Sequence, residues 1–435
     1  MPVAYIPRRP ARRTSPTLMP AEGIEVVEVR RTKNGNGEWM GEKERAVDIN
    51  CPNANGLACE IMRVIFEFGL SVTKGDLIAD GFWCFVSLHV LARTESVKWL
   101  LLKQRLEASC PSPRRYLMPL QRLPLKGTHM HLLKVCTTDR SGLLNDVAHI
   151  LWQLEFTIHR VNVSTCPDGQ AVDLLFITDE REELPSAERA NEVREQVLQE
   201  LDPLTTVELS IAGPECGVFS SLDCSPASRM MPSVAEALFP DDFDGWKDKN
   251  SEQATVKIDN AMSDKQTMVE IDARDRRGLM YDCMRTLKDL KLKVAMGRIV
   301  TREKGWCNVV VFVQTPEESQ VMSLEWQNEI IERLRREVLR PIRLDLVTKD
   351  TETELLIATP IEASSGKGRP RVLYDVTLAL RCLKICIFKA DITRHNVANK
   401  LWEVYRFVLT DLKGNPVAGA SGEMVKERVK HVLMG

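Results

Sequence analysis

Two stretches of the chain, Asp139-Arg140-Ser141-Gly142-Leu143 and Asp275-Arg276-Arg277-Gly278-Leu279, repeat one five-residue pattern almost letter for letter. Each stretch lies between an apolar segment and a segment whose apolar residues recur at helical spacing. Thirteen residues past each leucine the chain becomes apolar again, at Phe156 and at Leu292. Recurrence at a fixed offset indicates an internal repeat, so we expect two copies of one folding unit here.

Two weaker copies flank this pair. Leu57 is followed at the same distance by Leu70, and Val372 by Ile385. The chain is therefore predicted to be a tandem array of four small units.

The second unit shows the expected order of elements most clearly. Its segments read as strand, helix, two strands around a Gly turn, helix and strand: Met130–Cys136, Leu143–Leu154, Phe156–Ser164, Ala171–Thr178, Ala187–Leu201 and Thr205–Ile211. This βαββαβ order predicts an α+β, ferredoxin-like unit, with an antiparallel sheet covered by helices on one face. In the first unit, a short closing strand is expected near Tyr116–Met118.

The predicted boundaries follow from this pattern. Residues 1–43 form a basic tail with Arg8, Arg9, Arg12 and Arg13, expected to be disordered, and a Ser-, Pro- and Asp-rich linker over 213–253 separates the repeats into two pairs. The four units span 44–124, 127–212, 254–349 and 350–435. The fourth unit lacks a closing strand of its own, unless Arg340–Val347 or a partner chain completes its sheet.

Composition narrows the functional classes. The chain has 435 residues, 44% of them hydrophobic, and its net charge of -2 disfavours a general nucleic-acid binder. No apolar run is long enough to cross a bilayer, and the twelve cysteines are scattered without metal-ligand spacing. We expect a soluble, cytoplasmic protein with neither metal nor cofactor, although the Arg-rich start leaves a nuclear or organelle address open.

The four repeated units resemble ACT domains, and the whole array resembles the plant ACR (ACT domain repeat) proteins. The resemblance covers roughly Glu44 to Gly435 and includes the hairpins at Trp83-Cys84 and Trp306-Cys307. It implies that units pair side by side into wider sheets. It also implies that free amino acids bind at the interface, between the first loop of one unit and the second strand of its neighbour.

The loops predict where such a ligand binds. The N-terminus of a helix attracts a carboxylate, and an aspartate nearby can accept a hydrogen bond from an ammonium group. The candidate residues are therefore Asp139, Arg140, Gly142 and Leu143 in the second unit, Asp275, Arg276, Gly278 and Leu279 in the third, and Asn53, Gly56 and Leu57 in the first. The fourth loop carries Arg371 at the glycine position, so we expect a different ligand there or none.

A competing interpretation of the same loops is helix capping, in which Asp or Ser satisfies the first N–H groups of the helix. The fourth loop also contains Gly366-Lys367-Gly368, but it lacks the spacing of a phosphate-binding P-loop and is expected to be solvated.

Three functional classes compete with ligand sensing. ACT repeats also end a bacterial uridylyltransferase, but this sequence has no His-Asp doublet or nucleotidyl-transfer motif, so an enzyme is not expected. Gly81-Phe82-Trp83-Cys84-Phe85 faintly resembles the base-stacking strand of an RRM, which has the same topology. A ligand-free protein-interaction scaffold is the third class. We favour a non-catalytic amino-acid sensor for glutamine or a branched-chain type, read out by a protein partner or by self-association through its sheets, with no membrane contact.

Overall fold

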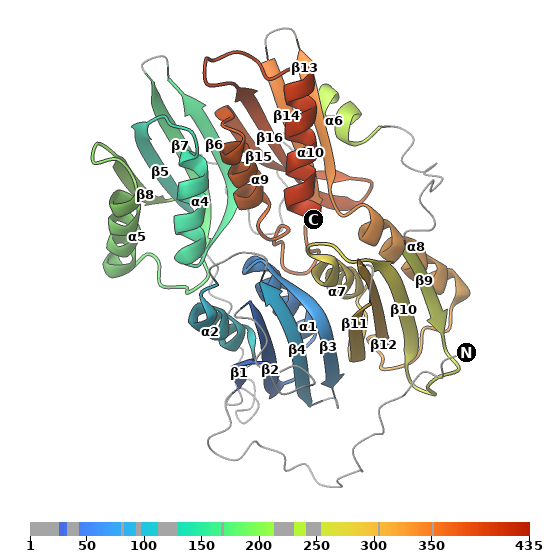
Figure 1. Ribbon diagram of the computed structural model, residues 1–435. Helices are drawn as coiled ribbons and strands as arrows, with labels where there is room; N and C mark the ends of the chain where they lie inside the picture. The colour runs from blue at the N-terminus through green and yellow to red at the C-terminus, as the bar shows by residue number, and fades with distance from the viewer. Residues whose placement is uncertain are drawn as a thin grey trace.

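The computed structural model describes residues 26–32, 43–79, 82–92, 97–111, 129–166, 169–212, 230–240, 254–302, 305–349 and 352–435. Within these ranges the chain forms two eight-stranded antiparallel sheets (Figure 1).

The first sheet joins the first unit to the third. Its strands are β1 (Val27–Arg31), β2 (Glu44–Pro52), β3 (Leu70–Ala79), β4 (Trp83–Ala92), β9 (Ala254–Asp259), β10 (Thr267–Arg274), β11 (Lys293–Arg302) and β12 (Trp306–Gln314). They lie in the order β1-β2-β4-β3-β11-β12-β10-β9.

The second sheet joins the fourth unit to the second. Its strands are β5 (His131–Thr138), β6 (Phe156–Thr165), β7 (Gln170–Asp179), β8 (Thr206–Ile211), β13 (Arg343–Lys349), β14 (Glu352–Pro360), β15 (Cys386–Val397) and β16 (Lys400–Thr410). They lie in the order β13-β14-β16-β15-β6-β7-β5-β8.

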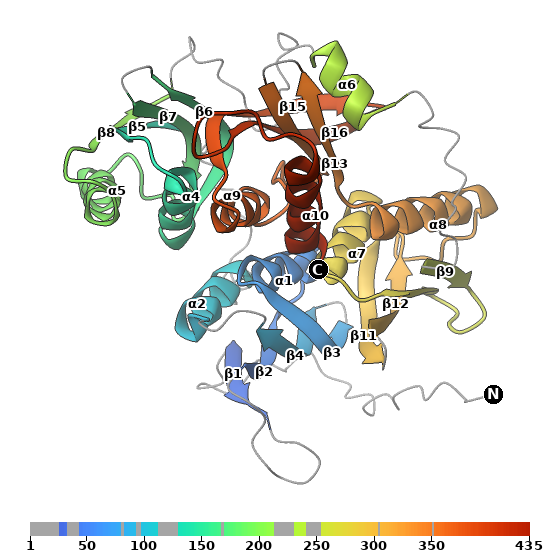
Figure 2. The same cartoon turned by 45° about the horizontal axis from the view of Figure 1, so that its top comes forward.

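Each sheet carries one layer of helices on its inner face, and the two layers face each other (Figure 2). The first sheet carries α1 (Leu57–Glu67), α2 (Trp99–Ser109), α7 (Leu279–Asp289) and α8 (Leu324–Leu339), and the second carries α4 (Leu143–Gln153), α5 (Ala187–Glu200), α9 (Val372–Cys382) and α10 (Ala420–Met434). The predicted α+β fold of ferredoxin-like units paired side by side is therefore confirmed.

The inner faces hold the apolar cores because strand residues alternate between the two faces of a sheet. On β5, Leu133 and Val135 are fully buried, and their neighbours in sequence are only half-buried. On α4, Val147 and Leu151 repeat at helical spacing and are also fully buried.

The pairing of units differs from the order of the sequence. The linker at 213–253 was expected to divide the repeats into consecutive pairs, but the first unit pairs with the third and the second with the fourth. Strand β3 joins β11 antiparallel, with Gly75 opposite Ile299, and β15 joins β6, with Ala390 opposite Val163. Units that are far apart in sequence therefore share each interface.

Three of the four units take their outer edge strand from the preceding segment. β1, inside the predicted basic tail, pairs with β2. β9 pairs with β10. β13, which was counted in the third unit, pairs with β14 and completes the fourth, as the alternative left open for Arg340–Val347 predicted. The strand expected at Tyr116–Met118 lies outside the described residues. Among the described strands, β8 is the one that closes a sheet as the last strand of its own unit, as predicted for the second unit.

The predicted linker also contains structure. Helix α6 (Pro232–Leu238) packs Val234 and Leu238 against Leu356 and Trp402 on the outer face of the second sheet. The fourth unit therefore has helices on both faces, in contrast to the one-sided cover that was expected.

Candidate functional site

The first loop of every unit has the same backbone conformation. Gly56, Gly142 and Gly278 precede α1, α4 and α7 with φ angles of 82°, 86° and 73°, a left-handed conformation that glycine adopts easily. Arg371 has the same left-handed conformation before α9, with φ of 66°. The fold therefore needs this turn in all four units, and the fourth unit forms it with a residue for which the conformation is strained.

Side-chain capping does not explain these glycines. In α1, α4 and α7 the N-cap residue is the glycine itself, and its cap carries no side-chain hydrogen bond. The predicted leucines that follow, Leu57, Leu143 and Leu279, are buried in the cores.

The paired unit covers each glycine with a side chain from its own helix. A Cβ added to Gly56 would come within 2.7 Å of Lys288, one added to Gly278 within 2.8 Å of Phe66, and one added to Gly142 within 2.7 Å of Arg381. The three loops differ in how this covering side chain is held in place.

The loop of the first unit is filled by internal ion pairs. Lys288 Nζ lies 2.7 Å from Glu60 and 3.4 Å from Glu362, both of them acidic side chains of the protein. Asn53, the expected ligand contact, uses its backbone N–H to donate to Phe82 O. In this structure the space over Gly56 belongs to the protein core, so the binding role predicted for Asn53, Gly56 and Leu57 stays a prediction.

The loop of the third unit is filled by a residue from the fourth. Arg369 is 3% exposed, pairs with Asp282 at 3.3 Å, and would lie 2.5 Å from a Cβ on Gly278. Arg276 also donates to Asp282, at 2.6 Å, and so does not face an open pocket. The binding role predicted for Asp275, Arg276, Gly278 and Leu279 therefore remains a prediction.

The basic loop of the fourth unit is part of the interface between the two halves. It was expected to be solvated, but Arg369 is buried and Arg371 donates to Glu67 O and to Asp375. Lys367 pairs with Glu180 of the second unit at 2.9 Å. The cations of this loop therefore neutralise acids of the protein.

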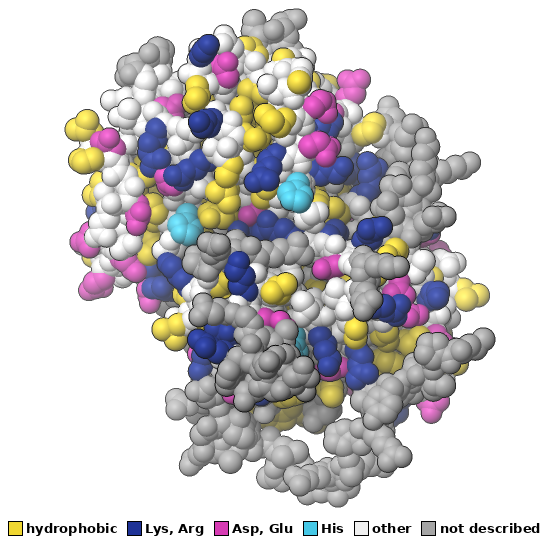
Figure 3. Space-filling model, viewed as in Figure 1, with side chains coloured by type: hydrophobic (Ala, Val, Ile, Leu, Met, Phe, Trp, Pro, Cys, Tyr) yellow, Lys and Arg dark blue, Asp and Glu magenta, His cyan; other side chains and the backbone are white. Residues whose placement is uncertain are grey.

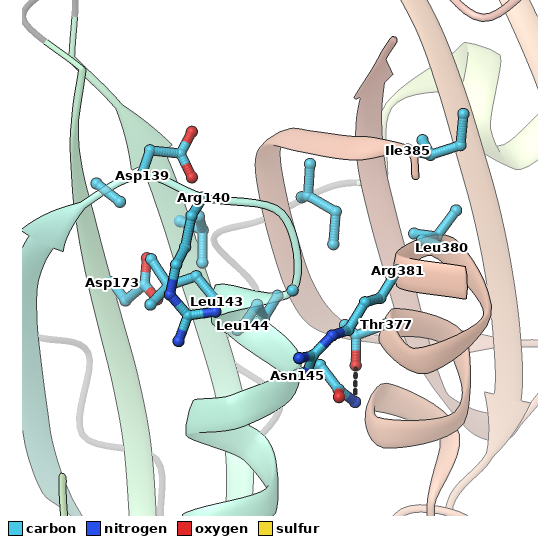
Figure 4. Close-up of a pocket in the computed structure, with 14 residues that line it drawn as sticks. Asp139, Arg140, Leu143, Leu144, Asn145, Asp173, Thr377, Leu380, Arg381 and Ile385 are labelled. Atoms are coloured by element: carbon cyan, nitrogen blue, oxygen red, sulfur yellow. Dashed lines mark hydrogen bonds between the residues drawn. The ribbon is translucent and has the colours of Figure 1, made fainter. Parts of the chain in front are cut away.

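The loop of the second unit differs because a cavity remains beside it, at the junction with the fourth unit (Figure 4). Its volume is about 20 Å³, room for about one water. The lining residues are Asp139, Arg140, Gly142, Leu143, Leu144, Asn145, Val163, Ala171, Asp173, Thr377, Leu380, Arg381, Ile385 and Ile387. All four residues predicted for this loop lie here, against α9 and the start of the second strand of the neighbouring unit.

An acidic side chain that was not among the predicted site residues lines the same cavity. Asp173 on β7 is 1% exposed, and neither of its carboxylate oxygens has a hydrogen-bond partner among the described residues. Burial, and then the negative charge of Asp139, raises the pKa of Asp173 to about 7. A charged residue within the apolar segment Ala171–Thr178 was the signal that could have revealed it.

The mouth of the cavity carries two guanidinium groups. Arg140 comes from the loop and Arg381 from α9, on opposite sides of the opening in Figure 4, and each lies 2.6 Å from Asp146. Beside them, Asn145 donates to Thr377 Oγ1 at 3.1 Å and joins α4 to α9. Acids line the cavity, and both acids and bases surround its mouth, an arrangement suited to a zwitterion.

A larger cleft of about 780 Å³ lies between the two halves, lined by α1, α2, α4 and the loop before α9. Arg63 on its wall donates to Glu362 at 2.5 Å, and Glu362 also accepts from the Tyr281 hydroxyl. Burial alone would raise the pKa of Glu362, but Arg63 and Lys288 lower it to about 2. The charged residue Arg63 on the wall of this cleft is therefore already neutralised by an acid of the protein.

The competing functions find little support. Phe85 of the RRM-like strand is half-exposed on the outer face of the first sheet, but the strands on either side of β4 carry Asp48 and Asp76 there. Figure 3 shows basic and acidic side chains interspersed over one face of the molecule. Across the described ranges no group of His, Cys, Asp or Glu is placed to hold a metal ion, and no helix is both long and apolar enough to cross a membrane.

Comparisons with known proteins agree with this architecture. Residues 36–111 match the family model for the N-terminal part of ACT domain-containing protein ACR10, residues 255–352 match an ACR9-like, ACT-like domain, and residues 353–435 match the C-terminal part of ACT domain-containing protein ACR9.

Full-length relatives are also similar. ACT domain-containing protein ACR9 of Arabidopsis thaliana is 40% identical over 395 residues, which cover 89% of this chain and 94% of the relative. ACT domain-containing protein ACR10 of the same plant is 35% identical over 91% of this chain and 97% of the relative.

Among solved structures, aspartate kinase from Synechocystis aligns over 94% of this chain and 55% of its own, with 14% identity and a TM-score of 0.16.

Proposed function

Because the chain belongs to the ACR family of ACT domain-containing proteins, we propose that it is a non-catalytic regulatory protein that binds one free amino acid between its second and fourth units. The observation that carries the proposal is the cavity beside Gly142, which Asp139 and the buried Asp173 line together. The ammonium group of an amino acid would give these carboxylates a cationic partner.

The two charged ends of an amino acid have separate partners at this site. Asp139, which already accepts a hydrogen bond from Thr165, can accept another from the ligand ammonium. Arg140 and the N–H groups at the start of α4 can bind the ligand carboxylate. Either contact is charge-assisted and worth about 1.5–3 kcal/mol.

Binding would act on the pairing of two units. The cavity has one wall from the second unit and the other from Thr377, Leu380 and Ile385 of the fourth. A ligand that contacts both walls stabilises this pair over any state in which the walls separate, and a protein partner can recognise the difference.

Isothermal titration of the full chain with each free amino acid tests the proposal. We expect one ligand per chain, and Asp139→Asn should weaken binding by about 10- to 100-fold, the loss of one charge-assisted hydrogen bond. The matched change in the filled loop, Asp275→Asn, should alter affinity by less than about 2-fold. The proposal is wrong if no amino acid binds at millimolar concentration, or if Asp275→Asn abolishes binding and Asp139→Asn does not.

A further inference from the structure

One residue distinguishes the second unit from the other three. Asp173 on β7 lies opposite Val135 on β5, and the same position of the third strand holds Val86, Val309 and Tyr405 in the other units. It points into the core layer between sheet and helices, where a buried charge without a partner destabilises the fold. When this aspartate is ionised, a cation beside it stabilises the charge, and the described residues hold none within hydrogen-bond distance of it.

Counting charges around the cavity shows what a ligand must supply. Asp139, Asp146 and Asp173 are three acids, and Arg140 and Arg381 are the two bases that pair with Asp146. A neutral zwitterion leaves this group of charges with one acid in excess. A ligand with a net charge of +1 balances it, provided that its second cation reaches Asp173.

The shape of the site fits such a ligand. The cavity beside Asp173 has the volume of about one water, which is also close to the size of an ammonium group. Over Gly142 lies the aliphatic stem of Arg381, whose Cδ would be 2.7 Å from an added Cβ. The Arg381 side chain is 46% exposed and held by a salt bridge at the surface, a contact that costs little to break. Once this stem moves aside, a flexible chain of similar length can lie in its place.

We propose, resting on the amino-acid site described above, that the ligand is a basic amino acid whose terminal cation binds Asp173. Its methylene chain passes Val163, Leu380 and Ile387, and its α-ammonium and carboxylate stay at the mouth with Asp139 and Arg140. This proposal differs from the expectation from sequence, which was glutamine or a branched-chain type.

Titration of the full chain with L-lysine, L-arginine and L-norleucine tests the assignment, because norleucine keeps the lysine chain length and lacks the terminal ammonium. We expect lysine or arginine to bind at least about 50-fold more tightly than norleucine, since a buried carboxylate that loses its partner is strongly penalised. Asp173→Asn should weaken binding of the basic amino acid by a similar factor and leave norleucine within about 2-fold.

Each result has a distinct meaning. If norleucine, leucine or glutamine binds as tightly as lysine and Asp173→Asn has no effect, the assignment to basic amino acids is overturned, and the amino-acid site itself stands. If no amino acid binds either protein, both proposals fail. Circular dichroism of Asp173→Asn gives the control for folding, and this variant is expected to be at least as stable as the natural chain.

Discussion

Replacing Asp173 with asparagine is expected to stabilise the protein when no amino acid is added. The substitution keeps the shape of the side chain and removes a carboxyl group that is 1% exposed and has no hydrogen-bond partner among the described residues. Most substitutions of buried polar residues destabilise a protein, so the expected sign is itself informative.

The magnitude follows from the pKa of the carboxyl group. Burial and the charge of Asp139 raise the pKa of Asp173 from 3.8 to about 7, which corresponds to about 4 kcal/mol at most. Below pH 4 the carboxyl is protonated in both the folded and the unfolded chain, so Asp173 carries no charge and does not destabilise the folded state. Between pH 4 and 7 the unfolded chain loses this proton first, so the folded state is progressively destabilised. Asp173→Asn should therefore gain stability over the natural chain as pH rises, reaching about 4 kcal/mol by pH 8.

Native-state hydrogen exchange of the β5, β6 and β7 amides measures this difference, because exchange reports the opening of that sheet alone. Asp179→Asn is the matched control: Asp179 is on the same strand and buried, but it pairs with Arg189 at 3.0 Å, and that arginine lowers its pKa against the effect of burial. This control should be less stable than the natural chain at neutral pH. The difference in free energy of unfolding between the two should disappear as pH falls through the pKa of Asp179. Equal destabilisation of both variants at pH 8 would mean that Asp173 has a partner after all.

Two further substitutions test the filled loops. Gly278→Ala puts a Cβ within 2.5 Å of the Arg369 guanidinium at a φ of 73° and should lower the free energy of unfolding by about 2–4 kcal/mol. The control Gly169→Ala, with φ of 82° and nothing within 4 Å, should lower it by about 1–2 kcal/mol. Equal decreases in Tm for the two variants would argue against the contact with Arg369. Glu362→Gln removes the acid that Arg63 binds at 2.5 Å and should cost about 3–5 kcal/mol in urea unfolding, and a loss under 1 kcal/mol would show that the pair is dispensable.

The local parts of the fold were predictable because they depend on short-range patterns. The Asp-x-x-Gly-Leu loops located the junctions of β5 with α4 and of β10 with α7, since a positive φ before an amphipathic helix leaves a clear sequence signature.

The pairing of units was not predictable from the same patterns. All four second strands carry a β-bulge at the equivalent residue, Thr73, His159, Ala295 or Phe388, so each presents a similar edge to its neighbours. Which two edges pair depends on contacts between residues far apart in sequence, and the composition of the linker carries no information about these contacts. Strand β1 was misplaced in the tail for the same reason, and β13 was counted in the third unit with its pairing to the fourth left open, because a strand that precedes its unit and one that follows it look alike in sequence.

The proposal that one of the four loops binds a ligand rests on divergence at a single position of the repeat. Phe66, Lys288 and Arg381 each lie ten residues past the loop residue of their own unit, and each covers the glycine of the paired unit. Phe66 is buried in the core and Lys288 pairs with two acids, one of which is fully buried, so moving either side chain would disrupt packing or a buried charge pair. Arg381 is held only by a salt bridge at the surface, worth about 0–1 kcal/mol, so the loop of the second unit is the one that opens at least cost. Asp173 on β7 lies behind the same loop and has no hydrogen-bond partner among the described residues, so the cover that is easily displaced and the acid that the proposed ligand would bind occur in the same pair of units.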